Sequence, residues 1–295
     1  MKKYLHLLLI ALCIALIGIS TSFSQTMVYV ATKHINKDFS DIKAIEINAE
    51  KADIEIEVWG NSTVSLSMEI SAKHPSKATA ANDIEFLKYI AEAKNGVLFL
   101  RNYLLLSQKD KKPESNFKTK YVLKIPADKL LEVKNSFGTV RVLGKTEKLI
   151  LKTEFCNVSL GQIGGVSQIK TKYGEANISG ISGDLNLESE RTNINLSDFS
   201  GIIAMKSYYG EVLLTKPRTL SSLTCMAEKS MVSLKMANFK SHKLILSTSS
   251  GQIYLPSELG KAITQKNGQM LEINSKENSN IKIHNKSGNI TLEKL

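Results

Sequence analysis

A repeat of 18 residues dominates the second half of this chain of 295 residues. Five segments follow one another at that spacing, centred on Gly138, Cys156, Gly174, Thr192 and Gly210. The pattern continues less regularly as CMAEKSMVSL, LSTSSGQIYL and IHNKSGNITL, with a weaker copy around Gly268, which makes eight or nine copies. A fixed period of this kind is typical of architectures in which each unit buries its apolar face against the next.

Each copy alternates apolar and polar residues on both sides of its central residue, which we call the anchor. The positions two and four residues after the anchor are apolar in nearly every copy, and so are most of the positions five and seven residues before it. Such alternation predicts two short strands with one buried face each. The frequent glycine at the anchor predicts a tight turn between them, in which glycine supplies the positive φ that such turns often need. The columns we expect in the core include Val158, Leu160, Ile178, Ile194, Leu196, Val212 and Leu214.

These columns predict an all-β fold, a β-solenoid of two-strand repeats of about 18 residues. A sandwich of hairpins would also alternate, but it would not require like residues to recur every 18 positions. Stacked coils place equivalent residues about 4.8 Å apart and pack like with like. The anchors Cys156, Thr192 and Ser230 depart from glycine, which leaves the number of complete coils open.

The N-terminal third is less regular and predicts a separate β region over residues 25–126, with the solenoid occupying 127–295. Residues 41–59 read as an early copy of the repeat, because Ile45, Ile47, Ile54 and Ile56 fall in its columns. A long insertion follows. Its apolar spacing predicts one amphipathic helix over about residues 79–93, then a strand over 97–106 and an exposed, lysine-rich loop over 107–120.

Residues 1–24 have the pattern of an export signal. Lys2 and Lys3 precede an uncharged run from Leu7 to Ile19, and small residues at 22 and 24 precede Gln25. Cys13 follows a leucine rather than a small residue, which argues against a lipid anchor there. We expect an exported protein in the periplasm, on the outer-membrane surface or outside the cell. No later segment has the roughly 18–20 apolar residues that a membrane-spanning helix needs.

Export would permit Cys156 and Cys225 to form a disulfide, but the repeat register argues against it. The two residues lie four coils apart, about 19 Å at the usual strand spacing, whereas a disulfide needs Cα atoms within about 7 Å. We predict two free, buried thiols.

The sequence holds no recognisable catalytic, metal or cofactor motif. The histidines are scattered, no Cys-x-x-Cys occurs, and the repeated Ser/Thr-x-x-Gly fits turn chemistry rather than nucleophile placement. An enzyme remains the less favoured alternative because β-helices also host glycosidases, which need two carboxylates roughly 5–10 Å apart. Glu175 and Glu211 form the one candidate pair, about 10 Å apart with Asn193 between them. We predict no catalytic residues, metal or cofactor.

An excess of basic residues and a row of outward-facing asparagines predict where the chain binds a partner. The formal net charge is +11, and seven basic residues against two acidic ones lie between residues 202 and 243. Outward-facing asparagines could hydrogen-bond a sugar or an extended chain. The binding candidates are Lys206, Lys216, Arg218, Lys229, Asn177 and Asn195. They suit an anionic glycan or cell-surface polymer, or an envelope protein, and the absence of aromatic stacking positions among the charges argues against nucleic acid.

The segment VLKIP at 122–126, followed by LEVKNSFGTVRV at 131–142 and the later repeat units, resembles the adhesin-like β-strand-repeat families of bacterial envelope proteins. The resemblance runs from about residue 40 to the end. It implies a right-handed β-helical structure like the head domains assigned to surface adhesins, and it brings no catalytic residues. Many members of these families have no assigned function. The Ser-Phe-Ser-Gln segment at 22–25 also resembles the signal ends of exported Bacteroidetes proteins.

We therefore predict a non-enzymatic, adhesin-like envelope protein that presents a rigid polar and basic surface to glycans or other polymers. The first alternative is a periplasmic scaffold or envelope-stress protein that binds a protein partner. The second is a carbohydrate-active enzyme built on a β-helix.

Overall fold

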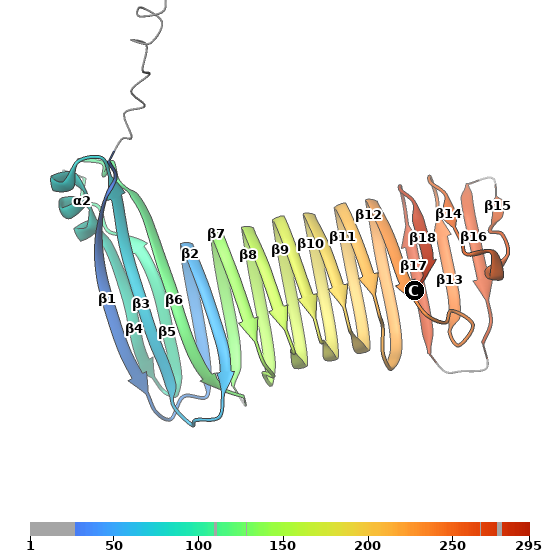
Figure 1. Cartoon of the computed structure of the whole chain (residues 1–295), viewed down its shortest axis with the longest axis horizontal. Helices are drawn as coiled ribbons and strands as arrows, with labels where there is room; N and C mark the ends of the chain where they lie inside the picture. The colour runs from blue at the N-terminus through green and yellow to red at the C-terminus, as the bar shows by residue number, and fades with distance from the viewer. Residues whose placement is uncertain (1–26, 109–110, 128, 266, 276–278) are drawn as a thin grey trace, which may run out of the picture.

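The computed structural model is an elongated rod of stacked strands (Figure 1). It describes residues 27–108, 111–127, 129–265, 267–275 and 279–295. The expected export signal, residues 1–24, lies outside the described residues. Within the described residues, no helix is long and apolar enough to cross a membrane.

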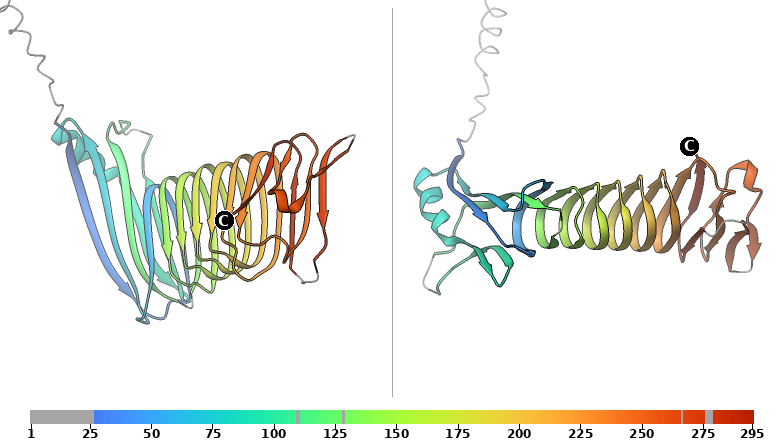
Figure 2. Two further views of the ribbon diagram at one scale, coloured as in Figure 1. Left: turned by 45° about the vertical axis from the view of Figure 1, so that its right-hand side comes forward. Right: turned by 90° about the horizontal axis from the view of Figure 1, so that it is seen from below.

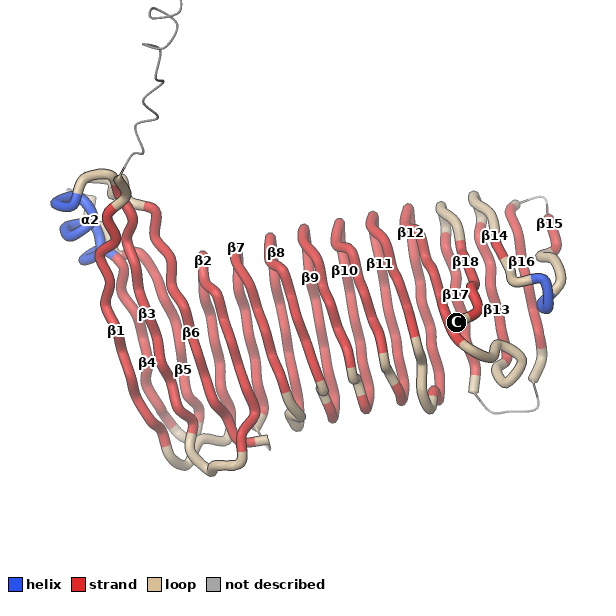
Figure 3. Tube along the Cα trace, in the orientation of Figure 1, coloured by secondary structure: helices blue, strands red, loops and turns tan. Residues whose placement is uncertain are grey.

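Strands make up nearly all of the described chain, and one short α-helix lies at the N-terminal end (Figure 3). The N-terminal strands are β1 (Tyr29–Phe39), β2 (Ala44–Trp59), β3 (Val64–His74), β4 (Leu87–Lys94), β5 (Val97–Leu104) and β6 (Asn116–Pro126). The central strands are β7 (Leu130–Leu143), β8 (Lys148–Gly161), β9 (Gly164–Ser179), β10 (Ser182–Ser197), β11 (Ser200–Thr215) and β12 (Leu220–Met236). The C-terminal strands are β13 (Lys243–Thr248), β14 (Ile253–Tyr254), β15 (Ile263–Gln265), β16 (Gly268–Ile273), β17 (Asn280–Asn285) and β18 (Ile290–Lys294).

The predicted solenoid is confirmed, with two layers joined by a bend inside each long strand. The half of β12 before its anchor pairs with β17, whereas the half after it pairs with β18. The same division runs through β7–β12, where like positions pair in parallel, as Leu187 does with Met205 and Leu196 with Leu214. We call the halves before the anchors the first layer and the halves after them the second layer. The bends line the turn edge, uppermost in Figure 1, and the links between coils line the connection edge.

The core lies between the two layers and consists of the predicted apolar columns. Ile194, Leu214 and Leu223 are fully buried, and one continuous apolar cluster runs from Ile42 to Leu292. The columns expected from the sequence are all at most 2% exposed, namely Val158, Leu160, Ile178, Ile194, Leu196, Val212 and Leu214. Stacking of like on like therefore holds the rod together along its whole length.

At each bend the left-handed residue is the one before the anchor, which corrects the expectation that glycine supplies it. Phe137, Phe155 and Tyr173 have φ of 65°, 54° and 53°. The anchor glycines have a different role, because a Cβ on Gly174 would lie 2.0 Å from the carbonyl oxygen of Cys156. Glycines alternate from coil to coil with anchors that carry a Cβ, in the order Ala52, Gly138, Cys156, Gly174, Thr192, Gly210, Ser230 and Gly288. The departures from glycine are thus part of a two-coil pattern.

The order of coils in space differs from their order in the sequence at the C-terminal end. The coil formed by β17 and β18 lies between β12 on one side and β13 and β14 on the other. The weak copy around Gly268 forms β16, which pairs antiparallel with β13 and not in the parallel register of the other copies. The final residues of the chain therefore lie inside the rod, and β15 and β16 end it.

The N-terminal insertion contains less helix than the sequence pattern predicts. The α-helix α2 spans Lys77–Asp83 and continues as a 3-10 turn, η1 (Ile84–Phe86), but the rest of the predicted helix, over 79–93, is strand β4. If this segment were helical, the backbone groups along one edge of β5 would have no partner. Pairing with β4 satisfies them, and this outweighs the helical spacing of the apolar residues. The predicted lysine-rich loop also ends early, because β6 begins at Asn116.

Candidate binding surfaces

The structure distributes the predicted binding residues over four surfaces. Lys206 lies on the first layer and Lys229 on the turn edge. Lys216 and Arg218 lie on the connection edge, between β11 and β12. Asn177 and Asn195 lie side by side on the second layer, at paired positions of β9 and β10. Of the six residues, the structure brings only Asn177 and Asn195 together, so the six do not form one binding site.

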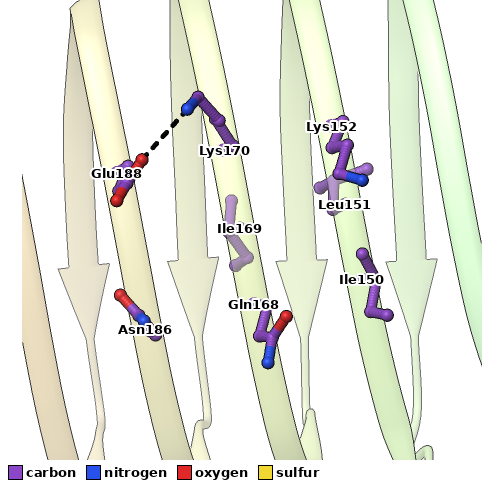
Figure 4. Close-up of a pocket in the computed structure, with 8 residues that line it drawn as sticks. All are labelled: Ile150, Leu151, Lys152, Gln168, Ile169, Lys170, Asn186 and Glu188. Atoms are coloured by element: carbon purple, nitrogen blue, oxygen red, sulfur yellow. Dashed lines mark ion pairs between the residues drawn. The ribbon is translucent and has the colours of Figure 1, made fainter.

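The first layer carries a ladder of exposed ion pairs, part of which is shown in Figure 4. Lys170 contacts Glu188 at 3.2 Å, and Lys206 approaches the same carboxylate at 3.9 Å from the next coil. A shallow hollow of about 180 Å³ lies beside them, with Gln168 and Asn186 on its wall. Exposed pairs of this kind stabilise a fold by less than about 1 kcal/mol each. Because Lys170 and Lys206 share one carboxylate, this face keeps an excess of positive charge.

The second layer carries the asparagine ladder, and its side chains bond mainly to one another. The Asn195 amide donates to Asn177 Oδ1 at 2.8 Å, and the Asn177 amide donates to Glu175 Oε1 at 2.8 Å. One coil further, Asn193 Oδ1 accepts the backbone N–H of Glu211 at 3.1 Å. Asn193 therefore lies between the two carboxylates that were the one candidate pair for hydrolysis, as the register predicted.

The turn edge carries a continuous stack of aromatic and cationic side chains. Phe137 stacks on Phe155 with ring centroids 5.0 Å apart, and Phe155 stacks on Tyr173 at 4.7 Å. The guanidinium of Arg191 lies between Tyr173 and Tyr209, 5.6 Å and 5.5 Å from their ring centres. The sequence column shows Arg191 as an interruption among aromatics, whereas in the structure it continues the stack through cation–π contacts.

The stack ends at Lys229, one of the predicted binding residues. Its ammonium lies 5.0 Å from the Tyr209 ring centre and donates to the Tyr209 hydroxyl at 3.1 Å. That hydrogen bond raises the pKa of Lys229, so the side chain stays cationic at neutral pH. The expectation that the basic segment 202–243 lacks aromatic stacking positions is therefore wrong at Tyr209. Phe137 and Phe155 are each 46% exposed, which leaves a long apolar ridge in contact with solvent.

A cavity of about 550 Å³ lies at the N-terminal end of the turn edge. We call it the junction cavity. Its lining combines charged, polar and apolar residues, namely Asn48, Ala49, Glu50, Lys51, Leu87, Arg101, Asn102, Tyr103, Leu104, Phe117, Lys118, Thr119, Ser136 and Phe137. Asn102 holds its wall in place by bonding the backbone of Glu50 in both directions, at 2.7 Å and 3.3 Å.

The two cysteines of the described chain are buried as free thiols. Cys156 and Cys225 are free and buried, as predicted, and burial raises their pKa to about 11 and about 12. Both are therefore protonated and unreactive at neutral pH. Among the described residues, no group of three or more His, Cys, Asp or Glu side chains could hold a metal ion.

Comparison with known families bears on the resemblance seen in the sequence. The model of the Toastrack DUF4097 family matches residues 42–293, which is most of the chain. The chain belongs to the Toastrack DUF4097 family. The match confirms the resemblance to adhesin-like repeat families, and it covers β2 and the N-terminal insertion together with the coils. No curated protein was found to match this Toastrack chain.

Solved structures similar to the Toastrack chain share little sequence with it. A candidate adhesin from Bacteroides fragilis is 13% identical with a TM-score of 0.36, and covers 89% of this chain and 97% of its own. A candidate cell adhesion protein from Clostridium sporogenes has 12% identity, a TM-score of 0.24 and coverage of 90% and 100%. A candidate lipid binding protein from Parabacteroides distasonis has 14% identity, a TM-score of 0.31 and coverage of 90% and 96%. These scores are too low to support an inference about function.

Sequence reasoning found the asparagine ladder of this Toastrack protein but missed the junction cavity. The feature of the sequence that could have indicated the cavity is the long insertion that follows the early repeat copy around Ala52. Inserted segments in repeat proteins commonly lie on the binding face. What the sequence does not show is that Arg101 and Lys51 come from different strands, β5 and β2, to the same opening.

Proposed function

We propose that this Toastrack chain is an exported, non-enzymatic, adhesin-like protein that binds surface glycans along its rod. The observation that supports this best is the second layer of β8, β9 and β10. There, amide and hydroxyl side chains recur over three coils, with one carboxylate, Glu175, between Asn157 and Asn193: the uncharged residues are Asn157, Ser159, Asn177, Ser179, Asn193, Asn195 and Ser197. Amides both donate and accept hydrogen bonds, which matches the hydroxyl groups of sugars.

The rigidity of the rod favours binding over catalysis. Each of these side chains lies on a strand paired on both sides, and the core beneath is fully packed. A preformed surface loses little conformational entropy when an extended polymer binds to it. Chains of sugars have a repeat of their own, so several weak contacts along one molecule add up through multivalency.

A glycan array probed with the purified protein tests the proposal. We expect binding to extended polysaccharides, and we expect the double substitution Asn177→Ala with Asn195→Ala to weaken it about tenfold, from two hydrogen bonds of about 0.7 kcal/mol each. Asn186→Ala, at an exposed position on the opposite layer of β10, is the matched control and should leave the affinity unchanged. Absence of binding to every glycan on the array would refute the proposal.

A further inference from the structure

The junction cavity exists because one coil of the rod has its turn replaced by an insertion. Asn48 pairs with Arg101 of β5, and Ala52 pairs with Thr119 of β6. Ala52 comes four positions after Asn48, whereas Thr119 comes eighteen positions after Arg101, so β5 and β6 form a coil with fourteen extra residues at its bend. Where other coils close with a tight turn, here the two layers separate and leave the opening. Figure 2 shows this end of the molecule spread wider than the coils.

An aromatic ring with a cation on the neighbouring coil borders the cavity. Phe137 is the first ring of the turn-edge stack and packs against Phe155 at 5.0 Å. Lys51 holds the same place in the preceding coil, because Glu50 pairs with Ser136 and Ala52 with Gly138, and both side chains line the cavity. A ligand in the cavity therefore has an apolar ring and a cation within reach. Leu87, Leu104 and Phe117 supply further apolar wall.

Two cations at the cavity lack an acidic partner. Lys51 and Arg101 form no ion pair within the described part of the chain, although Arg101 lies 5.3 Å from the ring centre of Tyr103. By contrast, Lys118 is paired with Asp53 at 2.5 Å. Glu50 is the one acidic residue in the lining, so the opening keeps a net positive charge. The cavity thus offers charge-assisted hydrogen bonds to an anion.

The polar wall of the cavity is held in a fixed position. Asn102 bonds the backbone of Glu50 in both directions, and its Oδ1 also accepts from the Tyr121 hydroxyl at 3.2 Å. A preformed polar wall loses little conformational entropy when a ligand binds to it.

We propose that the junction cavity binds an acidic sugar residue of a glycan. A volume of about 550 Å³ lies within the range of small-molecule sites. The mixed lining suits a sugar, with its hydroxyls and one flat C–H face, better than an acyl chain, which would cover the charged side chains of Lys51 and Arg101 without pairing them. The unpaired cations select a carboxylate. This inference rests on the proposed glycan binding, and it places one acidic sugar of the bound glycan in the junction cavity.

Saturation-transfer NMR with the purified protein tests the site, using D-glucuronate and neutral D-glucose as probes. We expect glucuronate to bind at least tenfold more tightly than glucose. The double substitution Lys51→Gln with Arg101→Gln should abolish that preference. Phe137→Asn should weaken both sugars at least threefold, because asparagine tolerates the left-handed bend but offers no ring.

Phe155→Asn is the matched control, since Phe155 is equally exposed on the next coil and does not line the cavity. If the two asparagine variants behave alike, or if the charge variants retain the preference for glucuronate, the cavity is not the site. Should the protein then still bind glycans on the array, the proposed function survives without it. If neither probe nor any arrayed glycan binds, the proposed function fails and this inference with it.

Discussion

Replacing Gly174 by alanine tests the close approach between neighbouring bends. The new methyl group would lie 2.0 Å from the Cys156 carbonyl oxygen, so the two coils must separate by more than 1 Å at a point where backbone is packed on backbone. Such overpacking costs about 2–3 kcal/mol, offset by about 0.5–1 kcal/mol because alanine restricts the unfolded chain. We expect a net loss of about 2 kcal/mol, or a fall in Tm of about 4–8 °C.

Gly60→Ala is the matched control for thermal unfolding followed by circular dichroism. Nothing lies within 4 Å of a Cβ built at Gly60, so the same substitution should leave Tm unchanged or raise it slightly. Thr192→Ala keeps a Cβ at the next anchor and removes only the hydroxyl bond to the Glu190 carbonyl, which costs about 1 kcal/mol. If Gly174→Ala unfolds no earlier than Gly60→Ala, the stacking geometry of the bends is wrong.

Four further predictions follow from the same contacts. Deleting residues 280–295 should unfold the C-terminal half of the rod in hydrogen exchange, because the coil lost lies inside it, and protection unchanged in β13 would contradict this. Leu196→Asp should abolish cooperative unfolding, since a buried unpaired charge costs several kcal/mol, and a wild-type Tm would disprove the column. Cys156 and Cys225 should resist a thiol reagent at pH 8 until denaturant is added; reaction in the native state would contradict their burial. Burial raises the pKa of Asp83, but hydrogen bonds from the backbone of Glu114 and Ser115 outweigh it and lower the pKa overall, so the carboxylate stabilises the fold above about pH 4 and loses this effect on acidification. The free energy of unfolding of the wild type should therefore exceed that of Asp83→Asn at neutral pH, and the difference should disappear at low pH. A difference that stays constant with pH would refute this.

The periodic columns were enough to predict the solenoid, because burial in a stacked coil depends on local alternation. Ile194 and Leu196 are buried through a period-two pattern that can be seen within one copy, and recurrence in the next copy sets the register. The same register correctly separated the two thiols. What is repeated in the sequence is therefore well predicted, since each copy is placed by its immediate neighbours.

Features that depend on contacts distant in the sequence could not be predicted in this way. The sequence of the copy IHNKSGNITL would look the same whether it lay at the end of the rod or between β12 and β13. Its position is set by the pairing of β17 with both β12 and β13. The spacing of Leu87 and Ala91 fits a helix, but the unpaired edge of β5 converts that segment to strand. The candidate cavity depends on where the two ends of the insertion rejoin the coil.

Protease accessibility on intact cells, with lysed cells as the control, tests most directly whether the rod is displayed as an adhesin-like protein. The account predicts that a tagged form of the chain is cleaved on intact cells at a rate close to that after lysis. Protection until lysis would contradict surface display and place the protein inside the envelope.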